Sequence, residues 1–314
     1  MRTKETIDLT TQRERIQMFT RVYHTDCARK LSRMKSDSVD LVISSPPYCM
    51  KKAYEAPTDD IETFKQTHLS IFNDLYRILK PGGSICWQIG YHVSDACVIP
   101  LDYLVYDIFT QCSQDKPIPL ILRNRIIWTF GHGLNSHNRF SGRHETVLWF
   151  SKGIPKTFRL DAVRVPQKYP GKRAYKGVRK GQLTGNPLGK NPSDVWDIPN
   201  VKANHCEKTE HPCQFPVAIP LRLIRALTNE NDLVLDPFTG SGTTGVAAVL
   251  ARRSFVGIEL NPKYVVVARK RIKQAKQGKA SVRPDVPVAP VDVKASVARL
   301  PEEFKTARML FSQR

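Results

Sequence analysis

One short segment of the sequence carries residue types that could do chemistry on a bound amine. Ser45-Pro46-Pro47-Tyr48 directly follows residues 41–44, which read Leu-Val-Ile-Ser and end a mostly apolar strand pattern. Two consecutive prolines fix the backbone and remove two N–H donors, so rigid carbonyl oxygens face any ligand there. The Ser45 hydroxyl and the Pro46 carbonyl can accept hydrogen bonds from an amine, and Tyr48 offers a ring on which a flat heterocycle can stack. A plain turn is the alternative interpretation of this segment.

A second segment has the pattern of a nucleoside-binding turn. Residues 234–244 read Val-Leu-Asp-Pro-Phe-Thr-Gly-Ser-Gly-Thr-Thr, a strand that runs through small residues into a helix. Glycines let a ligand approach the backbone, and the helix start offers free N–H groups. The next predicted strand ends at Glu259, 17 residues beyond Gly242, where an acid can accept both hydroxyls of a ribose. Because G-x-G-x-x-G is absent, a nucleoside with a small charged appendage is favoured over a dinucleotide.

Alternating strand and helix patterns must position these segments. The predicted strands are Phe19–His24, Val39–Ser45, Ser84–Ile89, Leu122–Phe130, Thr146–Phe150, Leu233–Asp236 and Phe255–Glu259. Helical spacing runs from Ile61 to Leu79 and ends at residues 80–83, and further helices begin near Thr243 and Pro262. About seven strands with helices between them predict an α/β, Rossmann-like, doubly wound and mostly parallel sheet, which binds ligands at the carboxyl ends of its strands.

Composition and charge limit the classes of protein. The 314 residues contain 49 Lys and Arg against 29 Asp and Glu, a formal net charge of +20, which indicates a polyanionic partner. Hydrophobic residues make up 41%, which excludes wholesale disorder. No apolar run approaches the roughly 18 residues that cross a bilayer, and residues 1–14 lack the apolar core of a secretion signal. Seven scattered cysteines suit a reducing, cytoplasmic compartment.

Residues 151–200 interrupt the α/β pattern. They hold 11 Lys and Arg against 3 Asp and Glu, with many glycines and prolines. A solvated surface insertion is one interpretation, and a basic insertion that contacts nucleic acid is the other, favoured once the rest of the chain is considered. The candidate contacts to phosphates or bases are Lys168, Lys172, Arg173, Lys176, Arg179 and Lys180.

The order of these segments is similar to that of a known family. Ser45–Tyr48 resembles the catalytic [S/N/D]-P-P-[Y/F] motif of the S-adenosylmethionine-dependent DNA amino-methyltransferases, and residues 236–242 resemble their cofactor motif. The catalytic motif first, the cofactor motif last and a basic insertion between them resemble the β group, over roughly residues 19–275. We expect residues 1–150 to form the first part of the catalytic domain, 151–210 a target-recognition insertion, 211–277 the cofactor-binding part, and 278–314 a linker and tail.

The resemblance implies a role for each matching residue. It makes Ser45, Pro46, Pro47 and Tyr48 catalytic. It assigns the adenine amine of the cofactor to Asp26, the ribose to Glu259 and the methionine moiety to the backbone of Phe238–Gly242. The full set of expected cofactor contacts is Asp26, Asp236, Phe238, Gly240, Ser241, Gly242 and Glu259.

Two further segments resemble family motifs with alternatives attached. Residues 211–216 read His-Pro-Cys-Gln-Phe-Pro where the family usually reads His-Pro-Thr-Gln-Lys-Pro, which puts side-chain contacts at Cys213 and Phe215 in doubt. Residues 143–145 (Arg-His-Glu) resemble a His-Glu stretch near the target base, with a surface ion pair as the equal alternative. A nucleophilic Cys213 that methylates ring carbon 5 is disfavoured by its place in the chain, and we expect no metal site.

The resemblance also implies the reaction. Ser-Pro-Pro-Tyr usually accompanies methylation of the cytosine N4 amine in duplex DNA, with the base flipped out of the helix. Adenine-N6 methylation is the first alternative, and an inactive DNA-binding protein that keeps the fold is the second. Double-stranded DNA is the expected partner, and the family adds a homodimer and a cognate restriction endonuclease as candidate partners.

Overall fold

The computed structural model describes residues 18–48, 60–94, 97–133, 135–166, 173–184, 186 and 188–284. Two candidate nucleic-acid contacts, Lys168 and Lys172, lie outside these residues, as does the expected tail beyond residue 284. The chain divides into a unit of Met1–Arg283 and a second unit of Pro284–Arg314, and every element named below belongs to the first. Within the described ranges, no helix is long and apolar enough to cross a bilayer.

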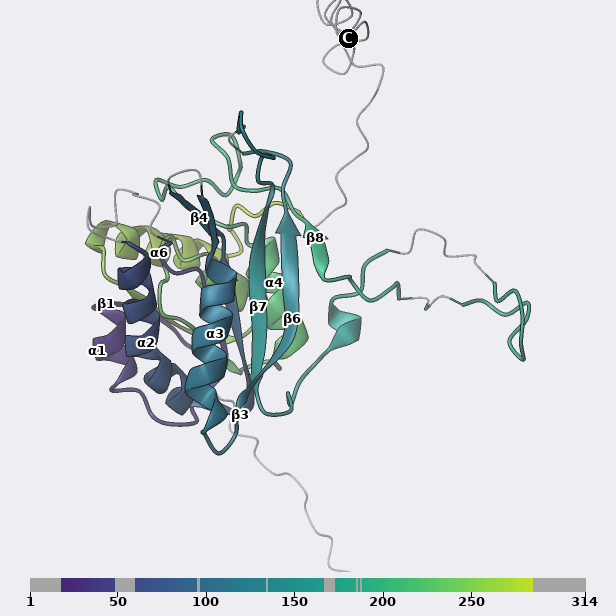
Figure 1. Cartoon of the computed structure of the whole chain (residues 1–314), viewed down its shortest axis with the longest axis horizontal. Helices are drawn as coiled ribbons and strands as arrows, with labels where there is room; N and C mark the ends of the chain where they lie inside the picture. The colour runs from purple at the N-terminus through teal and green to yellow at the C-terminus, as the bar shows by residue number, and fades with distance from the viewer. Residues whose placement is uncertain are drawn as a thin grey trace, which may run out of the picture. The chain divides into compact units, whose positions relative to one another are not determined.

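A mostly parallel sheet of eight strands lies at the centre of the first unit (Figure 1). Its spatial order is β1-β10-β9-β2-β3-β7-β6-β8. All neighbours are parallel except β7, which is antiparallel to both β3 and β6. The strands are β1 (Thr20–His24), β2 (Val39–Ser44), β3 (Leu79–Ile89), β6 (Leu120–Thr129), β7 (His144–Lys152), β8 (Val195–Asp197), β9 (Leu233–Asp236) and β10 (Ser254–Glu259). The predicted α/β fold class is confirmed.

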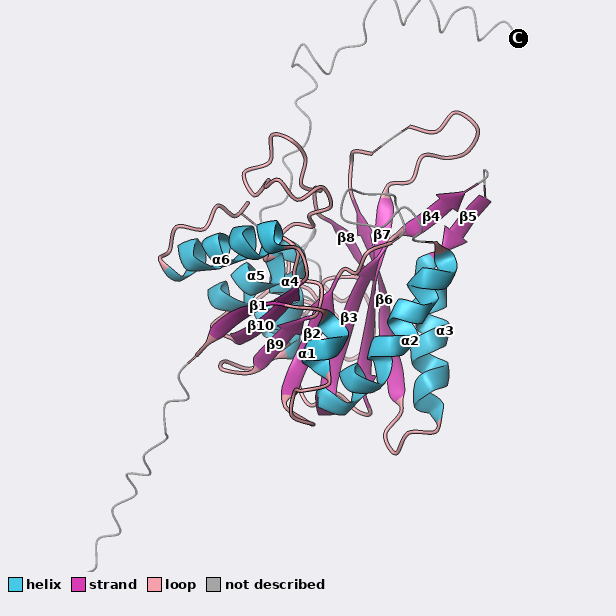
Figure 2. Ribbon diagram, turned by 90° about the vertical axis from the view of Figure 1, so that its left-hand side faces the viewer, coloured by secondary structure: helices cyan, strands magenta, loops and turns pink. Residues whose placement is uncertain are grey.

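Helices cover both faces of this sheet (Figure 2). One face carries α1 (Cys27–Leu31), α2 (Ile61–Ile78) and α3 (Leu101–Gln114), and the other carries α4 (Ala218–Leu227), α5 (Thr243–Leu250) and α6 (Pro262–Lys276). Val42 of β2 packs in the hydrophobic core beneath α1, α2 and α3, whereas Leu41 and Ile43 pack in the core beneath α4, α5 and α6. Because successive strand residues point to opposite faces, a strand covered on both sides needs the nearly continuous apolar run that β2 has.

The two strands that carry the candidate motifs are neighbours. Leu41 of β2 pairs with Val234 of β9, and Val42 pairs with Leu235. Since the strands are parallel and in register, both end at the same edge of the sheet. From this pair the chain continues to β3 on one side and to β10 on the other, which makes the edge a switch point of the kind where α/β proteins bind ligands.

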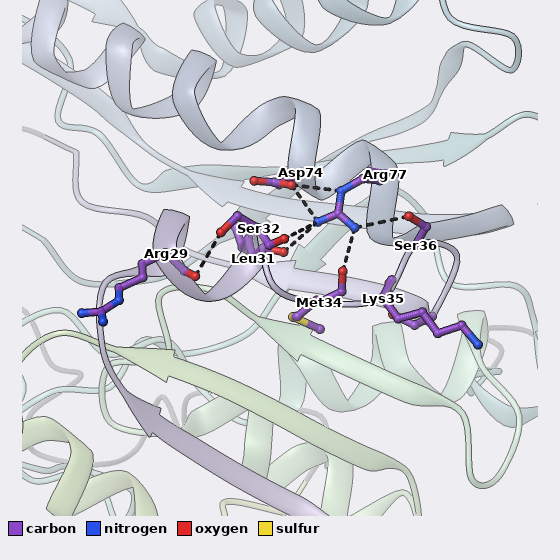
Figure 3. A network of polar contacts seen from close by, with 9 residues as sticks. Arg29, Leu31, Ser32, Met34, Lys35, Ser36, Asp74 and Arg77 are labelled. Carbon is purple, nitrogen blue, oxygen red and sulfur yellow. Dashed lines mark hydrogen bonds and ion pairs between the residues drawn. The ribbon is translucent and has the colours of Figure 1, made fainter.

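Arg77 of α2 fixes the short helix α1 in place (Figure 3). Its Nη2 donates to the Leu31 carbonyl at 2.9 Å, and its Nη1 donates to the Met34 carbonyl at 2.6 Å. The Asp74 carboxylate holds the same guanidinium at 2.7 Å. A helix of five residues is too short to be stable alone, so these bonds position it and, at its amino end, Asp26.

The structure differs from the predicted elements in three respects. Helix α2 ends at Ile78, as residues 80–83 predict, but these four residues belong to β3, which therefore begins earlier than predicted; they lie at a register shift between β2 and β3, where Asp40 pairs with Lys80 at 2.7 Å. The inserted region also adds the eighth strand, β8, beside β6. Three shorter elements had no predicted counterpart: β4 (Tyr91–Ser94), β5 (Cys97–Pro100) and the 3₁₀ helix η1 (Leu160–Ala162).

Candidate active site

A cleft of about 420 Å³ opens where β1, β2, β9 and β10 end. It brings together both candidate motifs and the loop after β1, although these lie far apart in the chain. The predicted site residues that line it are Asp26, Ser45, Pro46, Pro47, Tyr48, Phe238, Gly240, Ser241 and Glu259. The volume lies within the ~300–1,000 Å³ of small-molecule sites.

The Ser-Pro-Pro-Tyr segment turns back on itself at the end of β2. The Ser45 hydroxyl lies 2.8 Å from the Tyr48 hydroxyl. Tyr48 is buried, and its hydroxyl donates to Oε1 of Gln88 at 2.9 Å. Ser45 and Tyr48 are therefore coupled side chains rather than members of an open surface turn.

The Glu145 carboxylate lies next to the Tyr48 hydroxyl. Oε2 of Glu145, at the start of β7, lies 3.4 Å from the Tyr48 hydroxyl and accepts a hydrogen bond from Nε2 of Gln88. Burial raises the pKa of Glu145 to about 7, which the hydrogen bonds from Gln88 and Tyr48 oppose. Glu145 thus contacts the Ser-Pro-Pro-Tyr segment rather than forming a surface ion pair, and sequence reasoning missed its partner Gln88.

Buried Asp236 forms hydrogen bonds at both ends of the glycine turn. Its Oδ1 accepts hydrogen bonds from the Ser44 hydroxyl at 2.6 Å and the Phe238 N–H at 3.1 Å. Its Oδ2 accepts from the Thr244 hydroxyl at 2.6 Å. Burial raises the pKa of Asp236 to about 6. Both carboxylate oxygens are engaged within the protein and Asp236 does not line the cleft, so a contact with the cofactor stays a prediction for this residue.

Both glycines of the turn have conformations that require glycine. Gly240 has φ +50° and Gly242 has φ +81°. A Cβ on Gly240 would lie 2.9 Å from Nε2 of His211, and one on Gly242 would lie 2.8 Å from Ala268 of α6. Gly240 lines the cleft, whereas Gly242 supports the turn through this close packing on α6.

Glu259 closes the cleft at the end of β10. Its Oε2 accepts the Gly240 N–H at 2.8 Å, and its Oε1 accepts the Asn261 N–H at 2.7 Å. Burial raises the pKa of Glu259. A carboxylate has about four acceptor positions, so Glu259 can also accept a hydrogen bond from a ligand. Across the same cleft, Asp26 caps α1 by accepting the Arg29 N–H at 2.9 Å.

The segment before α4 forms another wall. His211, Cys213, Gln214 and Phe215 all line the cleft. The His211 ring packs against Tyr264 with centroids 4.5 Å apart, and burial lowers its pKa to about 4, so it is neutral at pH 7. Among the described residues, no group of three or more His, Cys, Asp or Glu side chains is arranged to hold a metal ion.

The described candidates for nucleic-acid contact lie apart from the cleft. Arg173, Lys176, Arg179 and Lys180 are exposed, and none of them lines it. Figure 1 shows their segment running away from the sheet beyond β8. Sequence reasoning did not single out Phe140, which is 99% exposed in the loop between β6 and β7, next to Arg139.

Comparisons with known proteins identify the family to which the chain belongs. The family model described as DNA methylase, N6_N4_Mtase, matches residues 39–270. The type II methyltransferase M.BglII of Bacillus subtilis is 43% identical over 80% of this chain and 68% of its own length. The DNA adenine methyltransferase YhdJ of Escherichia coli K12 is 31% identical over 81% of this chain and 83% of its own length.

Solved structures share the fold. The cytosine-N4-specific PvuII DNA methyltransferase superposes with a TM-score of 0.63 at 22% identity, over 82% of this chain and 92% of that one. TTHA0409 of Thermus thermophilus, complexed with S-adenosyl-L-methionine, gives 0.56 at 23% identity, over 83% and 97%. The family match spans both candidate motifs. The chain therefore belongs to the DNA methylase family of N6 and N4 amino-methyltransferases, with the motif order of the β group.

Proposed function

We propose that this protein methylates the exocyclic N4 amine of cytosine at a specific site in duplex DNA. The observation that carries the proposal is the neutral Ser45 hydroxyl, which lines the same cleft as Glu259 and the glycine turn. Ser-Pro-Pro-Tyr supports cytosine through its resemblance to the cytosine-N4 enzymes. Adenine-N6 methylation is the alternative, and the similarity to the adenine methyltransferase YhdJ favours it.

The groups that line the cleft suit the cofactor S-adenosylmethionine. Carboxylates of Asp26 and Glu259, the ring of Phe238 and the backbone of Gly240 and Ser241 face one cavity, and acids suit an amine and a pair of hydroxyls. We assign the adenine amine to Asp26, the ribose hydroxyls to Glu259 and the methionine moiety to the turn. When bound, S-adenosylmethionine would supply a methyl group on a positively charged sulfur, which the amine nitrogen of the base can attack.

The Ser-Pro-Pro-Tyr segment activates the nucleophile in this proposal. The lone pair of an exocyclic amine is drawn into the ring, which makes the nitrogen nearly planar and weakly nucleophilic. Ser45 Oγ and the Pro46 carbonyl oxygen accept hydrogen bonds from the two N–H groups of the amine. These bonds favour a pyramidal nitrogen with a free lone pair. Positioning and electrostatic stabilisation supply the acceleration, without a covalent enzyme intermediate.

Duplex DNA must deliver the base to this cleft. A base inside the helix cannot reach the edge of the sheet, so it flips out and stacks on Tyr48. The exposed cations Arg173, Lys176, Arg179 and Lys180 bind the phosphates. A homodimer, a cognate restriction endonuclease and a cytoplasmic location stay predictions from the sequence.

Identification of the methylated nucleoside tests the proposal. The protein is incubated with mixed-sequence duplex DNA and methyl-labelled S-adenosylmethionine, and the digested DNA is analysed by mass spectrometry. N4-methylcytosine supports the proposal, and N6-methyladenine replaces it with the alternative. 5-Methylcytosine would move the chemistry to a thiolate such as Cys213. Cofactor and DNA binding without any label would identify an inactive binding protein.

A further inference from the structure

A chain of hydrogen bonds leads inward from Ser45 to a carboxylate that the proposed mechanism has not used. Ser45 Oγ lies 2.8 Å from Tyr48 Oη, which donates to Gln88 Oε1 at 2.9 Å and lies 3.4 Å from Glu145 Oε2. Gln88 Nε2 donates to the same oxygen of Glu145. The four side chains come from the end of β2, from β3 and from β7, so tertiary pairing alone brings them together.

This series of hydrogen bonds connects two cavities. Ser45 and Tyr48 line the cofactor cleft. Glu145 lines a second cavity of about 590 Å³ between the β4–β5 hairpin and the loop that precedes β7, together with Gly90 and Tyr91. A proton that reaches Glu145 has therefore left the cleft.

The inner acceptors set the direction of the Ser45 hydroxyl. A tyrosine hydroxyl has one proton to donate, and the Gln88 oxygen and an ionised Glu145 both draw it inward. Tyr48 Oη then accepts from Ser45, whose lone pairs face the cleft and can accept from an amine. A protonated Glu145 can donate to Tyr48 instead, which turns the Ser45 proton outward against the hydrogens of the amine.

We propose that Glu145 orients the Ser45 hydroxyl and is the final acceptor of the proton that the methylated amine releases. The proposal rests on the proposed function and adds to it the step that a serine, a poor base, cannot complete alone. Glu145 does not touch the base, so it acts as a positioning residue through Tyr48 and Ser45.

The proton transfer balances without a further reactant. After methyl transfer the amine nitrogen carries a positive charge and one proton too many. That proton passes to Ser45 Oγ as the Ser45 proton passes to Tyr48 Oη and the Tyr48 proton passes to Glu145 Oε2. The products are a neutral methylated amine, unchanged Ser45 and Tyr48, and a protonated Glu145, which then loses its proton to water in the second cavity. The 3.4 Å step must shorten for this transfer, as catalytic hydrogen bonds do on substrate binding.

The surroundings of Glu145 suit a group that gains and loses a proton near neutral pH. Burial raises its pKa to about 7. The charged and titratable side chains that line the same cavity are Tyr91, Asp102, Arg125, Arg139, Arg143 and His144. Arg125 is already paired with Asp102 at 2.6 Å, and Arg143 donates to the Asn135 side chain at 2.6 Å.

Single-turnover methylation across pH tests this role. We expect the rate of the wild-type protein to rise with pH and to level off above about 7, because Glu145 must be ionised. Glu145→Gln is expected to lower the rate about 100-fold and to abolish this rise, while the Kd values for S-adenosylmethionine and DNA change less than twofold. Glu230→Gln, on an exposed loop, is the matched control and should keep the wild-type profile.

A second variant covers the case in which Glu145→Gln folds poorly. Tyr48→Phe keeps the ring but removes the hydroxyl, so it should cause the same loss of rate and of pH dependence. The double variant should be no slower than either single one, because all three interrupt one relay. A wild-type rate and profile in Glu145→Gln, or losses that multiply in the double variant, would overturn the relay. Failure of the wild-type protein to methylate any DNA would instead overturn the proposed function.

Discussion

Ser44 and Asp236 lie 192 residues apart in the sequence and are joined by a hydrogen bond of 2.6 Å. Ser44 is the last residue of β2, directly before the Ser-Pro-Pro-Tyr segment, and Asp236 is the last residue of β9, directly before the glycine turn. Both side chains are buried. The bond therefore fixes the segment that is proposed to hold the target amine relative to the proposed cofactor turn, which in-line transfer requires.

The variant Asp236→Asn tests the buried position of Asp236 through the pH dependence of the free energy of unfolding. The folded-state pKa of about 6 exceeds the ~3.9 of an unfolded aspartate. The native state binds the proton more tightly, so this group's contribution to the free energy of unfolding falls as pH rises from about 4 to about 6. Urea unfolding at several pH values should show a fall larger in the wild type than in the variant, by up to about 3 kcal/mol. Parallel curves for the two proteins would contradict this assignment.

Glu259→Gln tests the ribose contact. The amide keeps the size of the side chain but removes the charge and one of the two acceptor oxygens. Loss of a hydrogen bond to a charged group costs about 1.5–3 kcal/mol, so the Kd for S-adenosylmethionine should rise roughly 10- to 100-fold by calorimetry. Glu62→Gln, on the exposed side of α2, should bind normally. An unchanged Kd in Glu259→Gln would place the ribose elsewhere.

Gly242→Ala tests the packing of the turn on α6. The new Cβ would meet backbone and side-chain atoms of Ala268 at 2.8 Å, at a φ of +81°. Strain and overpacking together predict a loss of about 2–4 kcal/mol in the free energy of unfolding. Gly177→Ala is the matched control, because Gly177 has φ +77° with open space around it, and backbone strain alone costs about 1 kcal/mol. Equal losses in the two variants would rule out the packing contribution.

Neutralising the inserted cations tests the DNA surface. A variant with Arg173, Lys176, Arg179 and Lys180 all changed to Gln should bind duplex DNA more weakly and lower the salt slope of log K by up to about 4. Affinity for S-adenosylmethionine should be unchanged, because none of the four lines the cleft.

The control for that experiment removes the same charge from another surface. Lys263, Lys270, Lys273 and Lys276 are exposed on α6, and changing all four to Gln should leave the salt slope nearly as in the wild type. If both variants lose the same slope, net charge rather than the inserted region would explain DNA binding.

Local patterns were sufficient to predict the two halves of the site. The apolar run before Ser45 and the strand-turn-helix pattern around Gly240 are each contained in a short stretch of sequence, and parallel pairing places both at one edge. The family match confirms the fold and the methyltransferase class. The individual residue roles stay predictions.

Tertiary relationships were not visible in the sequence. Gln88 and Glu145 meet because β3 and β7 pair in antiparallel register, and nothing local in either strand indicates a partner. The direction of Asp236 was equally hidden, because a strand-end acid can face the ligand or the core. β8 is three residues among prolines and asparagines, too short for a period-2 pattern to predict.

Methylation by the wild-type protein and by Ser45→Ala, with cofactor affinity measured in parallel, tests the central claim most directly. The Ser45 hydroxyl beside the cofactor cleft is proposed to accept a hydrogen of the target amine. We therefore predict labelled N4-methylcytosine from the wild type, a rate at least about 100-fold lower in Ser45→Ala, and equal Kd values for S-adenosylmethionine. An undiminished rate in Ser45→Ala, or a methyl group on ring carbon 5, would contradict it.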